Sequence, residues 1–135
     1  LNYPCIVICG SLEEQLIDLE PEDRLQYLQT YGLKEPGIST LIRATSDLLG
    51  LISFFTFNEQ ELRAWLIPKG TRVVEAAGKI HTDMERGFIK AELVRWEDLL
   101  KAGSVAAARE QGHYRVEGRD YIVQDGDIIL IRFKS

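Results

Sequence analysis

The sequence predicts an α+β fold in which residues 50–135 form a β-grasp, or ubiquitin-like, sheet around one helix. Val73, Ala77 and Ile80 recur at helical spacing and give the segment after Thr71 one apolar face. Strand-like runs lie on both sides of this segment in the chain. A helix with one apolar face needs a sheet or another helix to cover it, and an antiparallel-rich sheet curled around it meets that need.

The second half of the chain reads as a hairpin, a helix, a strand, short helices and further strands. Pro68 ends the hairpin because proline cannot donate to a central ladder. Thr71 is expected to cap the helix, and Glu75 to pair with Lys79 four residues later. The expected elements are strands 51–57 and 61–67 around a turn at 58–60, the helix from Thr71 to near His81, a turn at Gly87, a strand with Phe88, Ile89, Ala91 and Leu93, helical turns at 97–101 and 104–111, a hairpin of 114–117 with 119–123, a turn at 125–127 and a strand at 128–133.

Residues 1–49 are expected to form a separate part with one short strand and three helices. The apolar run 5–9, CIVIC, suits a fully buried strand of a parallel sheet whose other strands lie outside this chain. Ser11 and Glu14 fit a capping box at the start of the first helix. The remaining expectations are a second helix from Pro21 to Gly32, a third helix from Ser39 or Thr40 through Leu49 with Leu41, Ala44, Leu48 and Leu49 facing inward, and a domain boundary at Gly50.

The composition suits a water-soluble chain of one domain plus a piece of another. The chain has 135 residues, of which 45% are hydrophobic, and no apolar run approaches the roughly 20 residues of a membrane span. Residues 1–48 hold eight acidic and three basic residues, whereas the rest of the chain is balanced, so a nucleic-acid partner for the second half stays open. Cys5 and Cys9 are too far apart on a strand for a disulfide, which indicates a reducing, cytoplasmic setting and favours buried thiols over a metal or redox site. Because the chain starts at Leu1, it is expected to be a fragment.

Three stretches of the sequence together resemble the C-terminal region of the YchF / Obg-like ATPases. They are CIVICGSLEEQL, the run LLGLISFFTFNEQELRAWLIPKGTRVVEAAGKIHTDMERGFIKAE and the tail YRVEGRDYIVQDGDIILIRF. The motifs RAW, GKIHTDMERGFI and VQDGD are specific in combination. The resemblance implies that residues 1–49 are the end of a P-loop nucleotide-binding (G) domain and that residues 50–135 are a TGS domain. It also implies a parent protein that hydrolyses ATP or GTP with Mg²⁺ in its own N-terminal G domain and associates with ribosomes.

The chain lacks the motifs that would hold a nucleotide. A phosphate-binding loop needs Gly-x-x-x-x-Gly-Lys-Ser/Thr, but the only Gly-Lys pair, Gly78-Lys79, has valine at the first glycine position and is followed by isoleucine. The resemblance places a short loop beside the nucleotide base at Cys9, Gly10 and Ser11, although serine stands there where the family commonly has lysine. We therefore expect no cofactor in this chain and no ATP binding or hydrolysis by it alone.

Two groups of residues invite a catalytic or metal-binding interpretation, and each also has a plainer one. His81, Thr82 and Asp83 contain a histidine and a carboxylate, as general acid–base chemistry requires. Consecutive residues seldom face one another, so a helix C-terminus is favoured, with a ligand or RNA contact as the alternative. Asp125 and Asp127 flank a glycine, which favours a turn over a cation site because Ca²⁺ takes six or more oxygens.

Basic and aromatic residues of the second half are the candidates for an RNA- or ribosome-binding surface. Phe54, Phe55, Trp65 and Phe88 either stack on bases or fill the core. The full set of binding candidates is Arg63, Trp65, Lys69, Arg72, Lys79, His81, Lys90, Arg115 and Arg119. The favoured partner is the ribosome or structured RNA, and the alternative is a regulatory protein–protein module without RNA contact. A sulfur-carrier or ubiquitin-like modifier is excluded because no Gly-Gly ends this sequence.

Overall fold

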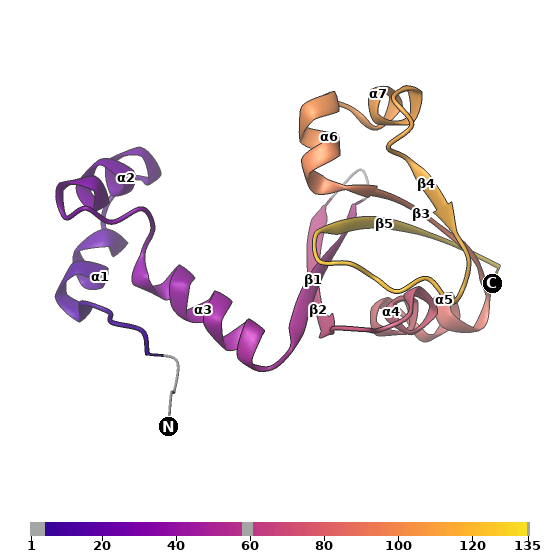
Figure 1. Ribbon diagram of the computed structural model, residues 1–135, viewed down its shortest axis with the longest axis horizontal. Coiled ribbons are helices and arrows are strands. Elements are labelled where there is room, and N and C mark those ends of the chain that lie inside the picture. The colour runs from indigo at the N-terminus through magenta and orange to yellow at the C-terminus, as the bar shows by residue number, and fades with distance from the viewer. Residues whose placement is uncertain (1–4, 58–60, 135) are drawn as a thin grey trace. The chain divides into compact units, whose positions relative to one another are not determined.

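The computed structural model describes residues 5–57 and 61–134, and the turn expected at 58–60 lies outside the described residues. The chain divides into two compact units, residues 1–49 and residues 50–135. Figure 1 shows three helices in the first unit and a sheet with short helices in the second.

Three helices make up the first unit: α1 (Gly10–Ile17), α2 (Pro21–Thr30) and α3 (Gly37–Leu48). Leu12, Leu16 and Leu28 form a small core between α1 and α2. Pro21 is the first residue of α2, as expected, and two acidic residues in the first turn complement the helix dipole. This core is small because α1 and α2 are each no more than ten residues long.

The predicted strand at residues 5–9 is wrong for the described chain. These residues have no regular secondary structure, and Val7 is 91% exposed. Cys5 and Cys9 are free and exposed, so the expectation of buried thiols is also wrong. No other strand lies in the described residues of this unit, and a strand needs a neighbour to pair its backbone groups.

Two helix-start assignments in this unit are wrong as well. Cys9 occupies the N-cap position of α1 without a side-chain cap, and the Ser11 hydroxyl lies 3.4 Å from the Cys9 sulfur instead of capping the helix. Helix α3 begins at Gly37 and buries none of its residues; Leu48, for example, is 74% exposed. Its apolar side chains remain partly exposed; Ile38 and Leu41, for example, are 51% and 41% exposed.

In its described residues, 50–57 and 61–134, the second unit contains one five-stranded sheet and four short helices. The strand order is β2-β1-β5-β3-β4, in which β1 and β5 run parallel and every other neighbouring pair is antiparallel. Its elements are β1 (Leu51–Phe57), β2 (Leu62–Pro68), α4 (Val73–Ile80), α5 (Thr82–Arg86), β3 (Phe88–Arg95), α6 (Trp96–Ala102), α7 (Val105–Glu110), β4 (Arg115–Glu117) and β5 (Asp127–Phe133). The predicted α+β class is therefore confirmed.

Helix α4 covers one face of the sheet and forms the main core with it. Val73 and Ala77 of α4 are fully buried and belong to one cluster with Phe54, Leu93 and Ile129 of the strands. Because side chains alternate along a strand, the residues next to these in each strand point to the opposite face. We call the α4 side the helix face and the other side the open face.

The start of α4 differs from the expectation by one residue. Arg72, not Thr71, is the N-cap, and Thr71 uses its hydroxyl to donate to the carbonyl of Pro68. The Glu75 carboxylate pairs with the Arg72 guanidinium at 2.9 Å instead of with Lys79. Glu75 therefore pairs with Arg72 at the N-cap and not with Lys79 one turn later.

Helices α6 and α7 cover part of the open face. Ala108 of α7 packs with Val94 and Ile128, which alternate with the residues that face α4. Figure 1 shows the α4–α5 pair and the α6–α7 pair on opposite sides of β5. The Ser104 hydroxyl accepts from the Ala107 amide and caps α7, within the segment 104–111 that was predicted to be helical.

The predicted hairpin of 114–117 with 119–123 is wrong. Strand β4 pairs with β3, so the segment after it is free to return to the start of α4. There the Val73 amide donates to the Tyr121 carbonyl at 2.8 Å, and the Val123 amide donates to the Thr71 carbonyl at 3.0 Å. The backbone groups of this segment are satisfied by the entry to α4 rather than by β4.

Candidate functional site

Two clusters of polar side chains in the second unit are each built around a buried carboxylate. Asp127 and Glu92 are the buried polar or charged residues of the described chain, with 0% and 8% of their surface exposed. Asp127 points to the helix face and Glu92 to the open face, as the pairing of β3 with β5 and the alternation of side chains require. A buried carboxylate is unfavourable unless its charge is paired or hydrogen-bonded, so the groups around each one explain why it is there.

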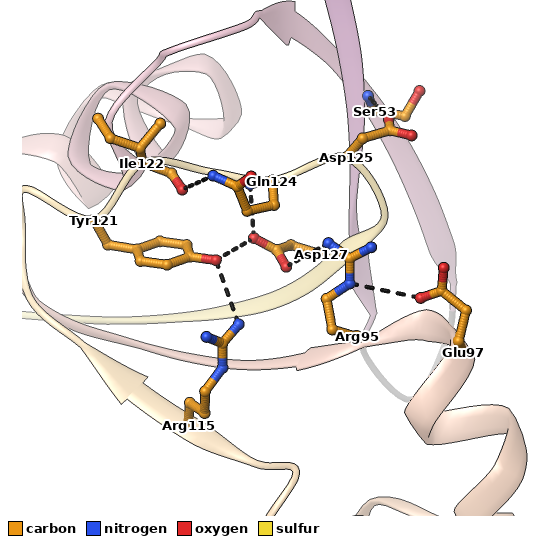
Figure 2. Close-up of polar contacts among 9 residues, drawn as sticks. All are labelled: Ser53, Arg95, Glu97, Arg115, Tyr121, Ile122, Gln124, Asp125 and Asp127. Carbon is orange, nitrogen blue, oxygen red and sulfur yellow. Dashed lines mark hydrogen bonds and ion pairs between the residues drawn. The ribbon is translucent and has the colours of Figure 1, made fainter.

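The Asp127 cluster ties the loop before β5 to the sheet (Figure 2). Asp127 Oδ2 accepts from the Tyr121 hydroxyl at 2.8 Å and from the Gln124 amide at 2.9 Å. The other oxygen, Oδ1, has no hydrogen-bond partner. The nearest cation to it is the Arg95 guanidinium, at 3.9 Å. Burial, followed by the hydrogen bond to Asp127, raises the pKa of Tyr121 to about 12. The phenol therefore stays a proton donor at neutral pH.

The neighbouring turn adds backbone contacts to this brace. Asp125 Oδ1 accepts from the Ser53 amide, and the Gly126 amide donates to the Ser53 carbonyl, at 2.7 and 2.8 Å. Gly126 has φ +83°, and a Cβ there would lie 2.4 Å from the Trp96 ring. Both aspartates therefore bind donors of the protein itself, as turn residues do.

The Glu92 cluster gathers basic side chains on the open face. Glu92 Oε2 accepts from Arg132 at 3.1 Å and from the Tyr114 hydroxyl at 2.9 Å, and Lys90 Nζ lies 3.2 Å from Oε1. The guanidinium of Arg109 lies over the Tyr114 ring, 4.4 Å from its centroid. The cluster thus holds three cations and one carboxylate.

The electrostatics of this cluster keep Glu92 ionised. The Arg132 guanidinium, helped by Tyr114 and Lys90, outweighs burial and lowers the pKa of Glu92 to about 2. Burial and the neighbouring carboxylate raise the pKa of Tyr114. The side chains of Lys90 and Arg132 nevertheless remain 44% and 51% exposed, so their other donors face solvent.

The predicted binding residues do not form one surface. Among them only Lys90 belongs to the Glu92 cluster. Arg63 and Trp65 lie on the helix face of β2, and Arg115 of β4 points to the same side, over the Tyr121 ring. Arg72 is bound by Glu75 and Asp120, and Arg119 lies over the Phe88 ring. Lys69 and Lys79 are exposed in the turn before α4 and on α4.

Arg63 and Trp65 do come together, but the tryptophan is already engaged. The Arg63 guanidinium lies 5.4 Å from the Trp65 ring centroid, and the Trp65 indole donates to the Thr56 hydroxyl at 2.9 Å. Trp65 also stacks on Phe54, with ring centroids 6.4 Å apart. Arg63, Trp65 and Thr56 line a cavity of about 200 Å³ whose apolar wall includes Ile80.

The other aromatic candidates are core residues. Phe54 is fully buried and Phe88 is 6% exposed, so neither presents a ring face to a base. Phe55 packs with the cluster under α7. The core interpretation is thus the one the structure supports for these three rings.

His81 and the loop at Cys9 have local structural roles. His81 Nδ1 accepts from the Asp83 amide and caps α5, so the histidine begins a helix as well as ending α4. Cys9, Gly10 and Ser11 form the start of α1, and the Ser11 hydroxyl together with the Leu12 amide lowers the pKa of the Cys9 thiol. These contacts account for the local geometry without a catalytic partner.

Arg109, Tyr114 and Arg132 were not among the binding residues predicted from the sequence. A usable signal was present for Arg132, since it follows Ile128 and Leu130 at a spacing of two and shares their face. No comparable signal linked Tyr114 to Glu92, because 22 residues separate them and the helices α6 and α7 intervene.

Within residues 5–57 and 61–134, no helix is both long and apolar enough to cross a bilayer.

Comparison with known proteins identifies relatives along nearly the whole chain. The model of the family YchF-GTPase_C, described as a protein of unknown function (DUF933), matches residues 51–134. The ribosome-binding ATPase YchF of Bacillus subtilis (strain 168) is 48% identical over 132 residues, which are 98% of this chain and 36% of that protein. Obg-like ATPase 1 of Gallus gallus is 45% identical over 96% of this chain and 33% of its own length.

A solved structure agrees with these matches. The YchF GTPase of Schizosaccharomyces pombe superposes with a TM-score of 0.80 at 32% identity, over 93% of this chain and 33% of that one. The chain spans about a third of the length of the curated relatives it matches. With the resemblance noted in the sequence thus confirmed, the chain belongs to the YchF-GTPase_C family.

Proposed function

We propose that residues 50–135 form a TGS domain of the β-grasp type that docks on the ribosome through RNA. The strand order β2-β1-β5-β3-β4, with the two central strands parallel and α4 across one face, supports the β-grasp assignment. Relatives that carry the printed name ribosome-binding ATPase support the partner. The cytoplasm is the compartment in which this partner would be met.

The observation that carries the docking proposal is the Glu92 cluster on the open face. Lys90, Arg132 and Arg109 present three positive charges around one carboxylate, and their side chains reach solvent. Phosphate contacts from lysine and arginine supply most of the non-specific affinity for nucleic acid. Of the remaining basic candidates, Arg63 and Arg115 point to the helix face, and Arg72 is bound by acidic neighbours. Arg119 lies over the Phe88 ring, and Lys69 and Lys79 are exposed outside the Glu92 cluster.

Residues 1–49 are proposed to be the closing part of a nucleotide-binding domain. Apolar side chains of α3, such as Ile38 and Leu41, line an apolar hollow with Ile8 and Leu16 of the same unit. The rest of a protein as long as the relatives would cover this hollow and supply the P-loop, the Mg²⁺ site and the ATP or GTP hydrolysis. Cys9, Gly10 and Ser11 would then lie beside the nucleotide base, and the 135-residue chain alone would bind no nucleotide in calorimetry.

Sedimentation of the 135-residue chain with purified bacterial ribosomes tests the docking proposal. The double variant Lys90→Gln/Arg132→Gln removes two open-face charges, whereas Lys69→Gln/Lys79→Gln removes two charges from the turn before α4 and from α4. We expect the first variant to bind about tenfold more weakly near 100 mM salt. Its log–log salt slope should also fall by about 1.4 to 1.8, because each of the two lost phosphate contacts removes about 0.7 to 0.9. Equal binding by the two double variants would refute the open face as the docking surface.

A protein–protein module is the second candidate, and the free edge of the sheet favours it. Among the strands of the described residues, β2 has no neighbour on its outer side, and Leu62 and Leu66 on its open face are 69% and 51% exposed. An added strand from a partner protein would pair with this edge. Capture of a defined partner from ribosome-free extract, lost in Leu66→Lys, together with no binding to ribosomes, would favour this function over RNA docking.

A further inference from the structure

We propose that Glu92 is a positioning residue that holds Lys90 and Arg132 as a preformed site for a phosphate of the RNA backbone. This inference rests on the docking function proposed above and names the chemistry of its contact. Glu92 itself would not touch the RNA. It would act by fixing the two cations that do.

The carboxylate of Glu92 bridges the two cations with one oxygen each. Lys90 Nζ lies 3.2 Å from Oε1, and Arg132 Nη2 lies 3.1 Å from Oε2. Lys90 and Arg132 are direct register partners on β3 and β5, so the backbone already places the two side chains side by side. The bridge brings their charged ends to a common point.

Each cation uses only part of its donor capacity in this bridge. An ammonium has three N–H donors and a guanidinium has five. Because about half of each side chain is exposed, the unused donors of Lys90 and Arg132 are available above the sheet. A phosphate oxygen can therefore be bound there without breaking the contacts to Glu92.

The bridge is itself held in place from below and from the side. The Glu92 side chain is only 10% exposed, and the Tyr114 hydroxyl gives it a third contact at 2.9 Å. Arg109 lies on the outer face of the same assembly, over the Tyr114 ring. Long basic side chains normally lose much rotamer freedom when they bind a phosphate, and side chains that are ordered beforehand lose less.

The charge of the site favours a phosphodiester over a protein carboxylate as its occupant. Three cations face one internal carboxylate, which leaves an excess of positive charge spread over α7, β3 and β5. An RNA backbone offers one negative charge per nucleotide along its length and can meet such a spread site, whereas a single protein carboxylate brings only one negative charge to it. Arginine also matches the phosphate geometry with its planar fork.

A positioning role and simple charge attraction predict opposite effects of Glu92→Gln on the affinity for RNA. It removes one negative charge from the site, so charge attraction alone predicts tighter RNA binding. Loss of the bridge predicts weaker binding, and we expect a three- to tenfold higher Kd for a fluorescein-labelled 20-base-pair RNA hairpin and for ribosomes. Glu117→Gln is the matched control. It also removes one negative charge, but from a side chain of β4 that points to the helix face. We expect its Kd to change by less than twofold.

The outcomes separate this inference from the docking proposal. If Glu92→Gln binds RNA as tightly as Glu117→Gln or more tightly, while Lys90→Gln/Arg132→Gln binds weakly, the positioning role is overturned and the docking surface stands. If neither open-face variant changes ribosome binding, both proposals fail. Tighter binding of a polyglutamate peptide than of the RNA hairpin at equal salt would overturn the phosphate assignment.

A second variant keeps the test decisive if Glu92→Gln unfolds. Tyr114→Phe leaves every charge in place and removes only the third contact to Glu92. Its melting transition is measured first by circular dichroism, and binding is measured where it is folded. We expect its Kd for the RNA hairpin to be about twofold higher than that of the wild type. An unchanged Kd would contradict the positioning role.

Discussion

The two buried carboxylates of the sheet, Asp127 and Glu92, lie on neighbouring strands but have different surroundings. Asp127 is fully buried, and its two hydrogen-bond donors, the Tyr121 hydroxyl and the Gln124 amide, belong to the loop that it braces. Glu92 binds two long cations whose ends remain about half exposed. One carboxylate therefore uses its charge to fix a loop, and the other uses it to arrange basic groups at the surface.

The comparison shows that burial alone does not distinguish a structural carboxylate from one at a binding surface. Asp127 has neutral donors at 2.8 and 2.9 Å, and its nearest cation is 3.9 Å away. Glu92 has cations at 3.1 and 3.2 Å that can bind a second anion. What differs is whether the partners have donors left over, and this difference leads to distinct predictions for the two sites.

The largest effect is expected for Asp127→Asn. The amide oxygen can replace Oδ2 and keep both hydrogen bonds, but the amide nitrogen then replaces Oδ1. That nitrogen would be a buried donor without an acceptor, 3.9 Å from the Arg95 guanidinium, and the negative charge that faces Arg95 would be lost. We expect a loss of about 2 to 4 kcal/mol in the free energy of unfolding, measured by urea denaturation. Ribosome binding by the folded fraction should be unchanged, because the cluster lies on the helix face.

The control for this prediction is Asp125→Asn in the same turn. Asp125 is exposed and accepts one hydrogen bond, from the Ser53 amide, so the expected loss is about 1 kcal/mol or less. Similar losses for the two variants would show that the buried Asp127 contacts do not brace the loop.

An intermediate effect is expected for Glu92 at acid pH. The native pKa of Glu92 is about 2, below the ordinary value of 4.5, so between these values the unfolded chain binds more protons than the native chain. The resulting stability is fully present above about pH 5 and is lost as the pH falls toward 2, at up to about 1.4 kcal/mol per pH unit. The difference in unfolding free energy between wild type and Glu92→Gln, measured by urea denaturation, should therefore shrink over this range. A constant difference would contradict the ion pairing.

The sequence was sufficient for local elements with a strong pattern and insufficient for the contacts that assemble the clusters. The apolar repeat of Val73, Ala77 and Ile80 predicted α4, and it lies on the core as expected. The hairpin at 114–123 was wrong because β4 had a distant partner, β3, which local turn signals do not reveal. The buried role of Asp127 was missed for the same reason, since its turn position is local but its covering by Tyr121 and Arg95 is tertiary.

In the first unit, too, the sequence pattern did not reveal which elements a segment would contact. The apolar run at residues 5–9 has the composition of a buried strand, yet in the described chain it has no neighbour with which to pair. Helix α3 likewise has an apolar face that stays exposed. Apolar pattern predicts that a segment is to be covered, but it cannot say whether the covering element is in the same stretch of chain.

The smallest effect on stability is expected from the ionisation of Tyr121 at alkaline pH. Burial and Asp127 raise the native pKa of Tyr121 to about 12, above its ordinary value of 10. Between these values the native chain keeps a proton that the unfolded chain loses, so stability falls as the pH rises from about 10 to 12. Tyr121→Phe should lose about 1 kcal/mol at neutral pH and show a shallower alkaline decline by urea denaturation. Tyr114→Phe, whose phenol serves the other carboxylate, should leave the Tyr121 contribution to that decline intact while weakening RNA binding. If instead Tyr121→Phe weakened RNA binding as much as Tyr114→Phe, the helix-face brace and the open-face site would not be independent, and the division of roles between Asp127 and Glu92 would be wrong.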